Sequence, residues 1–318
     1  MLQGPLSTLV APASAFGPAR DTRYPMRSMP RTLSIVGAGR VGRALGCILG
    51  ERGWRIGAVV DTSATAARAA VRAIGAGVPC ADLTRDVLAA DVVLITTPDD
   101  VVKDAAAQLA RLGGAEWRGK IVLHTSGSLS HAALAPLARR GAATAAMHPM
   151  QTFSTRGRPR LEGVIFGLDG DPRALRVARR IAKSLGGIPV EIRAASKPAY
   201  HVAGGFAAPQ VLTTLEAGTQ ILLRIGLSRR QATRALLNLA RQTLSNLERF
   251  GPRTAWSGPV SRGDFGTVAK HVAVLRAYPP EYLAAYAALT RLSARLLAPR
   301  PAAVLRRLRR IFGEENGK

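Results

Sequence analysis

Cysteine, aromatic and acidic residues are all scarce in this chain. Its 318 residues include only two cysteines, Cys47 and Cys80, which form neither a metal-binding motif nor a redox motif. So few thiols exclude a disulfide framework and favour a reducing compartment, the cytoplasm. We expect Cys47 to be a small buried residue of a helix. No apolar run approaches the roughly 18 residues that a membrane-spanning helix needs, so no membrane span is predicted.

Negative charge is scarce as well: 20 Asp and Glu face 45 Lys and Arg, a formal net charge of +25. A nucleic-acid-binding protein would gather its basic residues in a stripe with aromatic side chains between them. Here they are spread along the chain, and the one dense run, Arg306–Arg310, is expected to form a solvated or anion-attracting helix. We therefore do not expect nucleic acid as a partner, although the charge can steer anionic ligands.

The stretch before the first expected strand, residues 1–30, carries Pro, Ser, Gly and scattered Arg. It has no continuous apolar segment, so a cleaved secretory signal is not predicted. We expect a disordered extension, and Met26 and Met29 offer alternative starts.

A short apolar strand that runs into glycines is the most informative feature. The stretch SIVGAGRVG at residues 34–42 ends in G-x-G-x-x-G and opens directly into a helical pattern. A second strand follows at the right distance and ends on Asp61, nineteen residues after Gly42. Strand, helix, second strand and acid together are the context that dinucleotide binding requires. The expected contacts to the coenzyme come from Gly37, Ala38, Gly39, Arg40, Val41, Gly42 and Asp61.

The acid at the end of the second strand bears on the choice of coenzyme. A carboxylate there accepts hydrogen bonds from the ribose hydroxyls of NAD and repels a 2′-phosphate. Thr62 and Ser63 follow Asp61, and the nearest arginine is Arg68. The expected cofactor is NAD(P), with a preference for NAD.

Strands and helices alternate after residue 31, which is typical of a doubly wound α/β fold. Most of the strands are apolar on both faces, as in a parallel sheet covered by helices. We expect strands over 32–36, 55–60, 91–96, 121–125, 142–147, 163–168 and 188–192, and helices over 64–74, 100–112, 129–140 and 172–185. Residues 31–194 are thus predicted to form a Rossmann-type domain with a parallel sheet.

From residue 195 the strand pattern stops and long Ala- and Leu-rich helical segments follow. They are expected over 197–226, 228–249, 264–276, 280–298 and 301–312, with a break at Gly226 and a serine N-cap at Ser228. Residues 195–318 are predicted to be an all-helical domain for substrate binding and dimerisation. Its apolar content is high for one small bundle, which favours a homodimer through this domain.

Two loops at expected strand ends carry polar groups. In parallel sheets ligands bind beyond the carboxyl ends of the strands, so Thr97 and Pro98 are expected to contact the coenzyme. The structural interpretation is a strand stopped by proline and an N-cap at Asp99, and both interpretations can be true. In His124-Thr125-Ser126-Gly127-Ser128, we expect Ser126 to present a hydroxyl to the substrate. His124 and His131 are expected to be structural.

Three further basic side chains are candidates for chemistry. His148 follows a strand and precedes Pro149, and its imidazole can act as acid, base or hydrogen-bond donor. Lys197 and His201 are four apart at the start of a helix, so they share a face. They can hold a carboxylate or relay a proton, but an exposed lysine and an interface histidine fit the spacing equally. In the loop at 256–264, Arg262 can clamp an acid group and Asp264 can cap the following helix. We favour a structural turn over a site, and insertion into a partner subunit's cleft is a third alternative.

Six stretches together make the chain resemble a known family. They read VGAGRVG, TTPDD, HTSGSLS, HPMQTF, KPAYH and SGPVSRGD. The sequence resembles bacterial oxidoreductases with a Rossmann-like first domain and a C-terminal domain of unknown function, number 2520, over residues 31–298. More distantly it is similar to the superfamily of 6-phosphogluconate dehydrogenase, ketopantoate reductase and pyrroline-5-carboxylate reductase.

The resemblance implies hydride transfer, NAD(P) as cofactor and a dimer built through the helical domain. Lys197 matches the lysine of the hydroxyacid branch, while His201 stands where that branch has asparagine. The HPM at 148–150 is similar to a histidine motif of prephenate dehydrogenases. Our hypothesis is an oxidoreductase for a small anionic hydroxy, keto or imino acid, with Lys197, His201, His148 and Ser126 at the catalytic site and no metal. The alternative is a nucleotide sensor or scaffold that keeps the fold without chemistry.

Overall fold

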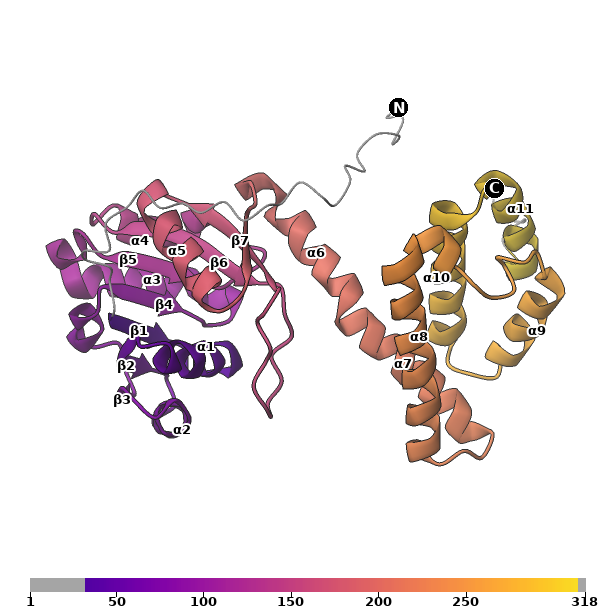
Figure 1. The fold of residues 1–318 in the computed structure, drawn as a ribbon, viewed down its shortest axis with the longest axis horizontal. Helices are drawn as coiled ribbons and strands as arrows, with labels where there is room; N and C mark the ends of the chain where they lie inside the picture. The colour runs from indigo at the N-terminus through magenta and orange to yellow at the C-terminus, as the bar shows by residue number, and fades with distance from the viewer. Residues whose placement is uncertain (1–31, 314–318) are drawn as a thin grey trace. The chain divides into compact units, whose positions relative to one another are not determined.

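The computed structural model describes residues 32–313, so the expectations for residues 1–30 lie outside the described residues. Eight strands form one sheet and are joined by helices and short 3-10 turns (Figure 1). The strands are β1 (Thr32–Val36), β2 (Arg55–Val60), β3 (Val78–Cys80), β4 (Val92–Ile95), β5 (Ile121–His124), β6 (Ala143–Pro149), β7 (Ile165–Gly170) and β8 (Ile188–Glu191). The helices around them are α1 (Arg40–Glu51), α2 (Ala64–Ile74), α3 (Asp99–Gly113), α4 (Ala135–Ala138) and α5 (Pro172–Ser184).

The sheet has the order β3-β2-β1-β4-β5-β6-β7-β8. The first six strands are parallel, and the order reverses between β1 and β4. This is the doubly wound arrangement, whose ligands bind at the carboxyl edge beside the switch point. The Rossmann-type fold class predicted from the alternation of strands and helices is confirmed.

Two strands differ from the expectation. β3 was not expected, because three residues with Pro79 at the centre give no strand pattern; proline is tolerated there since β3 is an edge strand. β7 runs antiparallel to β6, with His148 opposite Gly167. The pattern of apolar residues carries no information on strand direction, so a wholly parallel sheet was the wrong expectation at this end.

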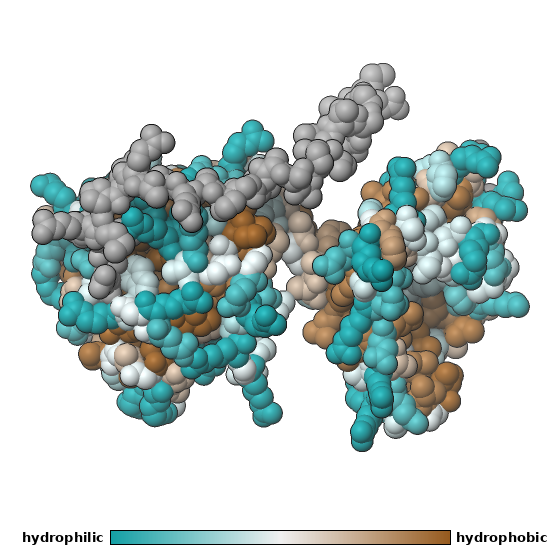
Figure 2. Space-filling view, viewed as in Figure 1, coloured by the Kyte–Doolittle hydropathy of each residue, from teal (hydrophilic) through white to brown (hydrophobic). Residues whose placement is uncertain are grey.

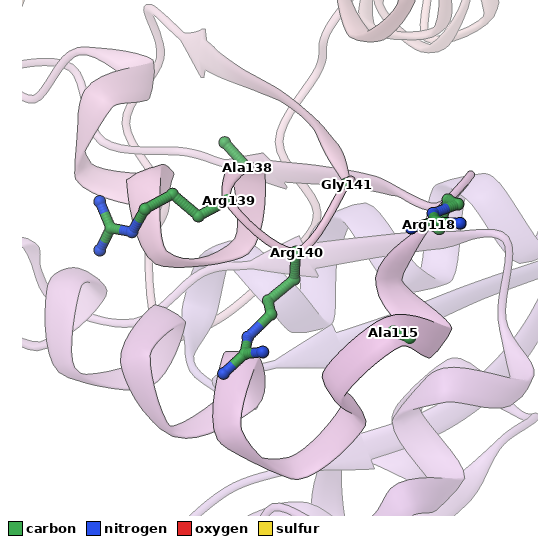
Figure 3. Close-up of a pocket in the computed structure, with 6 residues that line it drawn as sticks. All are labelled: Ala115, Arg118, Ala138, Arg139, Arg140 and Gly141. Carbon is green, nitrogen blue, oxygen red and sulfur yellow. The ribbon is translucent and has the colours of Figure 1, made fainter.

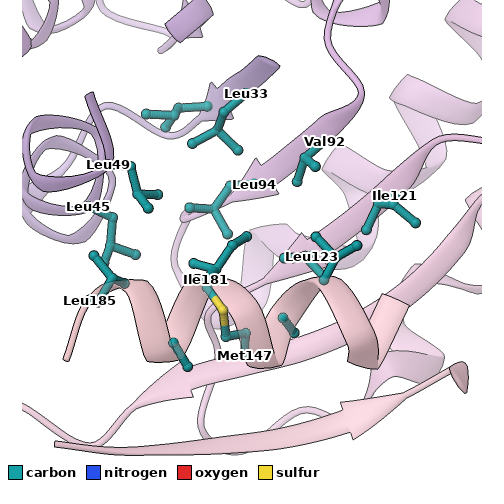
Figure 4. Packing of buried hydrophobic residues seen from close by; sticks show 14 of the residues in the cluster. Leu33, Leu45, Leu49, Val92, Leu94, Ile121, Leu123, Met147, Ile181 and Leu185 are labelled. Carbon is teal, nitrogen blue, oxygen red and sulfur yellow. The ribbon is translucent and has the colours of Figure 1, made fainter. Parts of the chain in front are cut away.

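Alternate residues of the central strands feed two cores, one on each face of the sheet. Leu33, Leu94 and Leu123 pack with α1 and α5 residues such as Leu45 and Ile181 (Figure 4). Their neighbours along the strands pack on the other face, against α3, α4 and the 3-10 turn Arg85–Ala89. Burial on both faces fixes the strand register, since a slip by one residue would exchange the two cores.

The chain divides into two compact units between Val202 and Ala203. The second contains helices only, within the residues that the structure describes. The helices after the sheet are α6 (Lys197–Ala207), α7 (Pro209–Arg224), α8 (Arg229–Ala255), α9 (Phe265–Leu275), α10 (Pro280–Leu297) and α11 (Pro301–Phe312). None of the helices between residues 32 and 313 combines the length and apolar character that a membrane crossing needs.

Prolines explain two departures of the helices from the expected ranges. Pro209 begins α7 and separates it from α6, because a proline inside a helix removes a hydrogen bond and clashes with the preceding turn. Pro136 likewise sits in the first turn of α4, so residues 129–140 form a 3-10 turn and a short helix. The predicted cap at Ser228 is confirmed: its side chain accepts from the Gln231 amide, and Gln231 completes a capping box.

Candidate functional site

The glycines after β1 divide into two that are crowded and one that faces open space. Gly37 has φ of 101°, and a Cβ there would lie 2.8 Å from the Thr96 carbonyl carbon. A Cβ on Gly42 would lie 2.2 Å from the Gly37 oxygen. At Gly39 no described atom lies within 4 Å of the Cβ position. The loop is therefore packed where the backbone turns and open where a ligand would approach it.

The N-terminus of α1 faces the same opening. No side chain of the described residues caps this helix at Gly39, and its first turn contains no acidic residue. Its free amides and the helix dipole therefore favour an anionic group such as a pyrophosphate. Asp61 lies beside this loop: its Oδ2 accepts from the Ala38 amide at 2.9 Å and its Oδ1 from the Ser63 amide at 3.0 Å.

The loop after β4 borders the glycine turn. The Thr96 hydroxyl donates to the Gly37 carbonyl at 2.6 Å, a contact that sequence reasoning missed because the two residues are 59 apart. The hydroxyl of the next residue, Thr97, is buried and has no hydrogen-bond partner among residues 32–313. Buried polar groups are normally satisfied. The unpaired Thr97 oxygen thus fits a group supplied by a ligand.

The loop after β5 is held together by His124. Its Nδ1 accepts from the Ser126 amide at 3.2 Å and its Nε2 donates to the Ser130 carbonyl at 3.1 Å. Burial lowers the pKa of His124 to about 4, so the ring is neutral at pH 7. These contacts agree with the structural role expected for His124.

Ser126 and Ser128 have different partners within this loop. The Ser126 hydroxyl accepts from the Leu129 amide at 3.0 Å and is almost wholly buried. The Ser128 hydroxyl donates to Asp99 at 2.6 Å. Asp99 is the first residue of α3, whose N-cap is Pro98. The expected N-cap role of Asp99 is therefore wrong: its carboxylate links α3 to the loop after β5.

His148 lies near the end of β6, next to Gly127 of that loop. A Cβ on Gly127 would lie 2.9 Å from His148 Nε2 and 2.5 Å from His201 Cδ2. The two imidazoles contact each other edge to face, with ring centroids 5.8 Å apart. Burial, followed by the neighbouring charges of His201 and Lys197, lowers the pKa of His148 to about 4. Gly127 is thus the residue that makes room for both rings.

Lys197 is fully buried, although an exposed lysine fitted the spacing equally well. It begins α6, and Pro198 follows it in the first helical turn, where the missing N–H costs nothing. Its Nζ has no hydrogen-bond partner in the described part of the chain. Burial lowers the pKa of this amine, while the charges of Asp169 and Asp99 oppose that shift. A buried amine without a partner is costly unless a ligand completes it.

The first unit therefore gathers several of the predicted residues. Asp99 at the start of α3 accepts a hydrogen bond from Ser128 in the loop after β5. In the same loop, Gly127 lies against the rings of His148 and His201. The charge of Asp99 also acts on the amine of Lys197. Tyr200, which we did not single out, joins them: its hydroxyl lies 3.1 Å from His148 Nδ1. The motif KPAYH contains Tyr200, but nothing in the sequence pairs it with a residue 52 positions away.

Two other predicted groups have local roles. His131 contacts Asp169 through both its backbone amide and its Nδ1, at 2.8 and 3.0 Å. Asp264 accepts from the Thr267 amide at 3.0 Å and caps α9. The structural role expected for each is confirmed.

A surface hollow of about 310 Å³ lies away from these residues (Figure 3). Its lining includes Arg118, Arg139, Arg140 and Gly141, which precede the amino ends of β5 and β6. The side chains of Arg139 and Arg140 point in different directions in Figure 3. Because ligands of this fold bind at the opposite, carboxyl edge, we do not assign the hollow to the candidate site.

Two family profiles match the chain. A Rossmann-like domain matches residues 18–149, and DUF2520, a domain of unknown function, matches residues 164–293. A sequence search against curated proteins finds no match.

Several solved structures share the fold. A Bacteroides fragilis protein is 19% identical, with a TM-score of 0.69 over 82% of this chain and 97% of that one. A Thermotoga maritima protein is 23% identical, with a TM-score of 0.58 over 90% and 100% of the two chains. A reductive aminase from Aspergillus terreus, solved with NADPH and ethyl-5-oxohexanoate, is 17% identical, with a TM-score of 0.62 over 84% and 94%. At these identities the likeness establishes the fold.

Proposed function

Because the chain joins a Rossmann-like domain to a DUF2520 domain, we propose that it is an NAD(P)-dependent oxidoreductase. The reaction is hydride transfer between nicotinamide and a small anionic hydroxy, keto or imino acid. The observation that carries the proposal is Lys197: a fully buried amine without a hydrogen-bond partner among residues 32–313, in one cluster with His148 and His201. Such an amine is suited to hold or protonate an anionic substrate group.

The glycine loop supports the coenzyme part of this proposal. The open space at Gly39, the uncapped start of α1 and the unpaired Thr97 hydroxyl fit a dinucleotide. When bound, the nicotinamide supplies or accepts the hydride. The remaining contacts proposed for the coenzyme come from Gly37, Ala38, Arg40, Val41, Gly42, Asp61 and Pro98.

The residues of the chain itself bind the substrate and move the proton. Lys197 holds the anionic group or supplies a proton, and His148 and His201 contact the reacting end of the substrate. Ser126 keeps the loop in place, because its hydroxyl accepts from the amides of Ser128 and Leu129. The neutral ring of His148 lets it donate a hydrogen bond without adding a second positive charge next to Lys197.

Asp61 supports a preference for NAD over NADP. Its carboxylate lies beside the glycine loop, where it would accept from ribose hydroxyls and repel a 2′-phosphate. The fungal reductive aminase with the same fold was solved with NADPH, so the fold alone does not decide between NAD and NADP. Isothermal titration with NADH and NADPH is the test, and tighter binding of NADPH would contradict the preference.

Gly39→Ala tests the coenzyme site. The added Cβ meets no described atom and Gly39 has φ of −70°, so the variant should fold normally. It would nevertheless occupy the space expected for the pyrophosphate, and we expect NADH affinity to fall about tenfold or more, equivalent to about 1.4 kcal/mol. The matched control is Gly50→Ala at the other end of α1, where the nearest atom is 3.8 Å from the Cβ position.

Turnover distinguishes an enzyme from a nucleotide-binding protein without chemistry. A panel of 2-oxo acids and cyclic imines is offered to the protein with NADH and with NADPH. Oxidation of the coenzyme by one of them supports the proposal. Binding of coenzyme without oxidation by any member would favour a sensor or scaffold instead.

The exposed apolar residues of the helical unit support a homodimer through this domain. Leu239, Leu244, Leu247 and Phe250 on α8 are all more than 40% exposed. Figure 2 shows brown apolar patches on this unit. A surface of that kind commonly marks a protein interface, and a second copy of the chain is the occupant we propose.

A further inference from the structure

Tyr200 occupies a place that the sheet keeps free for it. His148 on β6 is opposite Gly167 on β7, and a Cβ on Gly167 would lie 2.8 Å from both Cζ and Oη of Tyr200. The tyrosine ring meets the His148 ring edge to face, with centroids 5.5 Å apart and planes at 88°. The phenol group is therefore held against one nitrogen of His148 by the absence of a side chain at residue 167.

The direction of the hydrogen bond between Tyr200 and His148 depends on the tautomer of the imidazole. The Tyr200 hydroxyl lies 3.1 Å from His148 Nδ1 and 3.5 Å from the His148 carbonyl oxygen, at the limit of a hydrogen bond. Burial raises the pKa of Tyr200, so its oxygen keeps the proton. A phenol that donates to Nδ1 leaves that nitrogen without a proton of its own. A neutral imidazole that accepts at Nδ1 carries its own proton on Nε2.

The other nitrogen of His148 faces the loop after β5. Nε2 lies toward Gly127 and has no hydrogen-bond partner among the residues that the structure describes. The charged and titratable groups that act on this ring are His201, Lys197, Asp99 and His124. Because His124 uses both of its nitrogens for the backbone, it does not compete for a ligand.

We propose that Tyr200 is a positioning residue that fixes His148 as the Nε2–H tautomer, which makes this nitrogen a hydrogen-bond donor to the substrate. The substrate part of this inference rests on the proposed function. A donor at that place requires a lone pair on the reacting group. The carbonyl oxygen of an oxo acid supplies one, whereas a protonated iminium nitrogen does not. His148 thus favours oxo acids and their alcohols over iminium substrates.

The tautomer can be measured without any substrate or coenzyme. Long-range ¹H–¹⁵N correlation spectra of the ¹⁵N-labelled full chain at pH 7 distinguish a protonated ring nitrogen from an unprotonated one, and His148→Gln assigns the signals. We expect the proton on Nε2 in the wild type. In Tyr200→Phe the Nδ1 signal should move toward the value of a nitrogen without a hydrogen bond.

The second unit offers a matched control. Tyr286 contacts His271 Nδ1 at 2.8 Å in the same edge-to-face geometry. Tyr286→Phe should move the His271 signals and leave those of His148 unchanged.

Two results would overturn the inference. One is a proton on Nδ1 of His148 in the wild type, which needs no variant to detect. The other is a Tyr200→Phe protein, folded by its amide spectrum, whose His148 nitrogen signals are unchanged. Either result leaves the oxidoreductase proposal standing, since that proposal is decided by coenzyme binding and turnover.

Discussion

Lys197 places an ionisable amine inside the protein without a hydrogen-bond partner among the described residues. The burial of an unsatisfied charged group costs about 1–3 kcal/mol or more, and such a cost is retained where function requires it. Under the proposed function, Lys197 lowers the stability of the fold and in return supplies a group that acts on the substrate.

Lys197→Met tests whether the buried amine lowers the stability of the fold and is needed for turnover. We expect the free energy of unfolding to rise by about 1–3 kcal/mol, because an apolar side chain of similar length replaces the amine. Turnover of the best oxo acid or imine should fall about a hundredfold or more, with NADH affinity unchanged. Urea unfolding and steady-state kinetics measure the two effects. Lys183→Met on the exposed side of α5 is the control, and unchanged turnover in Lys197→Met would remove Lys197 from the mechanism.

His148 makes stability depend on pH. Its pKa falls from 6.5 to about 4 on folding, so between these values the unfolded chain binds more protons than the folded one. Stability therefore rises with pH through this window and is lost as the pH falls. His148→Gln should reduce the slope by up to about 1.4 kcal/mol per pH unit. Urea unfolding followed by tryptophan fluorescence between pH 4 and 7 measures it, and equal slopes for both proteins would contradict the burial of a neutral ring.

Contacts between distant residues mark the limit of sequence reasoning at this scale. The glycine pattern predicts the turn at Gly37 and the packing at Gly42, because both follow from local geometry. The role of Tyr200 depends on Gly167 and His148, which lie on two other elements. Asp99 has the sequence context of a helix cap, and only the fold shows that Ser128 lies within reach of it.

At the scale of elements, the contribution of a helix N-cap to stability can be tested by a single substitution. Ser228→Ala removes the half of the capping box at the start of α8 in which the Ser228 hydroxyl accepts from the Gln231 amide, and it keeps the half in which the Ser228 amide donates to the Gln231 side chain. We expect the helical unit to lose about 1 kcal/mol, measured by urea unfolding followed by circular dichroism. Thr243→Ala, at an exposed interior position of the same helix, is the control and should be neutral or slightly stabilising. Equal losses in both variants would show that the cap contributes nothing of its own.

Long elements were predicted well. Short elements, and the direction in which a strand runs, were predicted poorly. The ranges expected for α2 and α11, 64–74 and 301–312, are confirmed. β3 was not predicted because it has only three residues. The single helix expected over 197–226 was wrong because Pro209 begins a new helix. The direction of β7 depends on how the chain returns after β6, which no local pattern contains.

At the scale of the whole molecule, the proposed dimer makes a direct prediction. Leu244 on α8 is 61% exposed. If its face pairs with a second copy, Leu244→Glu should raise the dimer dissociation constant at least tenfold, because a carboxylate would have to lose its water. Sedimentation velocity over a concentration series measures this. Gln242→Glu adds the same charge on the same helix at a polar position, and equal weakening by both variants would point to net charge rather than to this face.

Gly127 has a consequence for the genetic tolerance of the protein. Every missense change of its codon adds at least one carbon atom where the rings of His148 and His201 already lie. A residue with no functional group of its own is therefore constrained by the chemistry of its neighbours. In a survey of all single substitutions scored for activity, position 127 should accept as few replacements as positions 148 and 201. Activity would fall because an added side chain displaces the two rings, and not because a reactive group is removed.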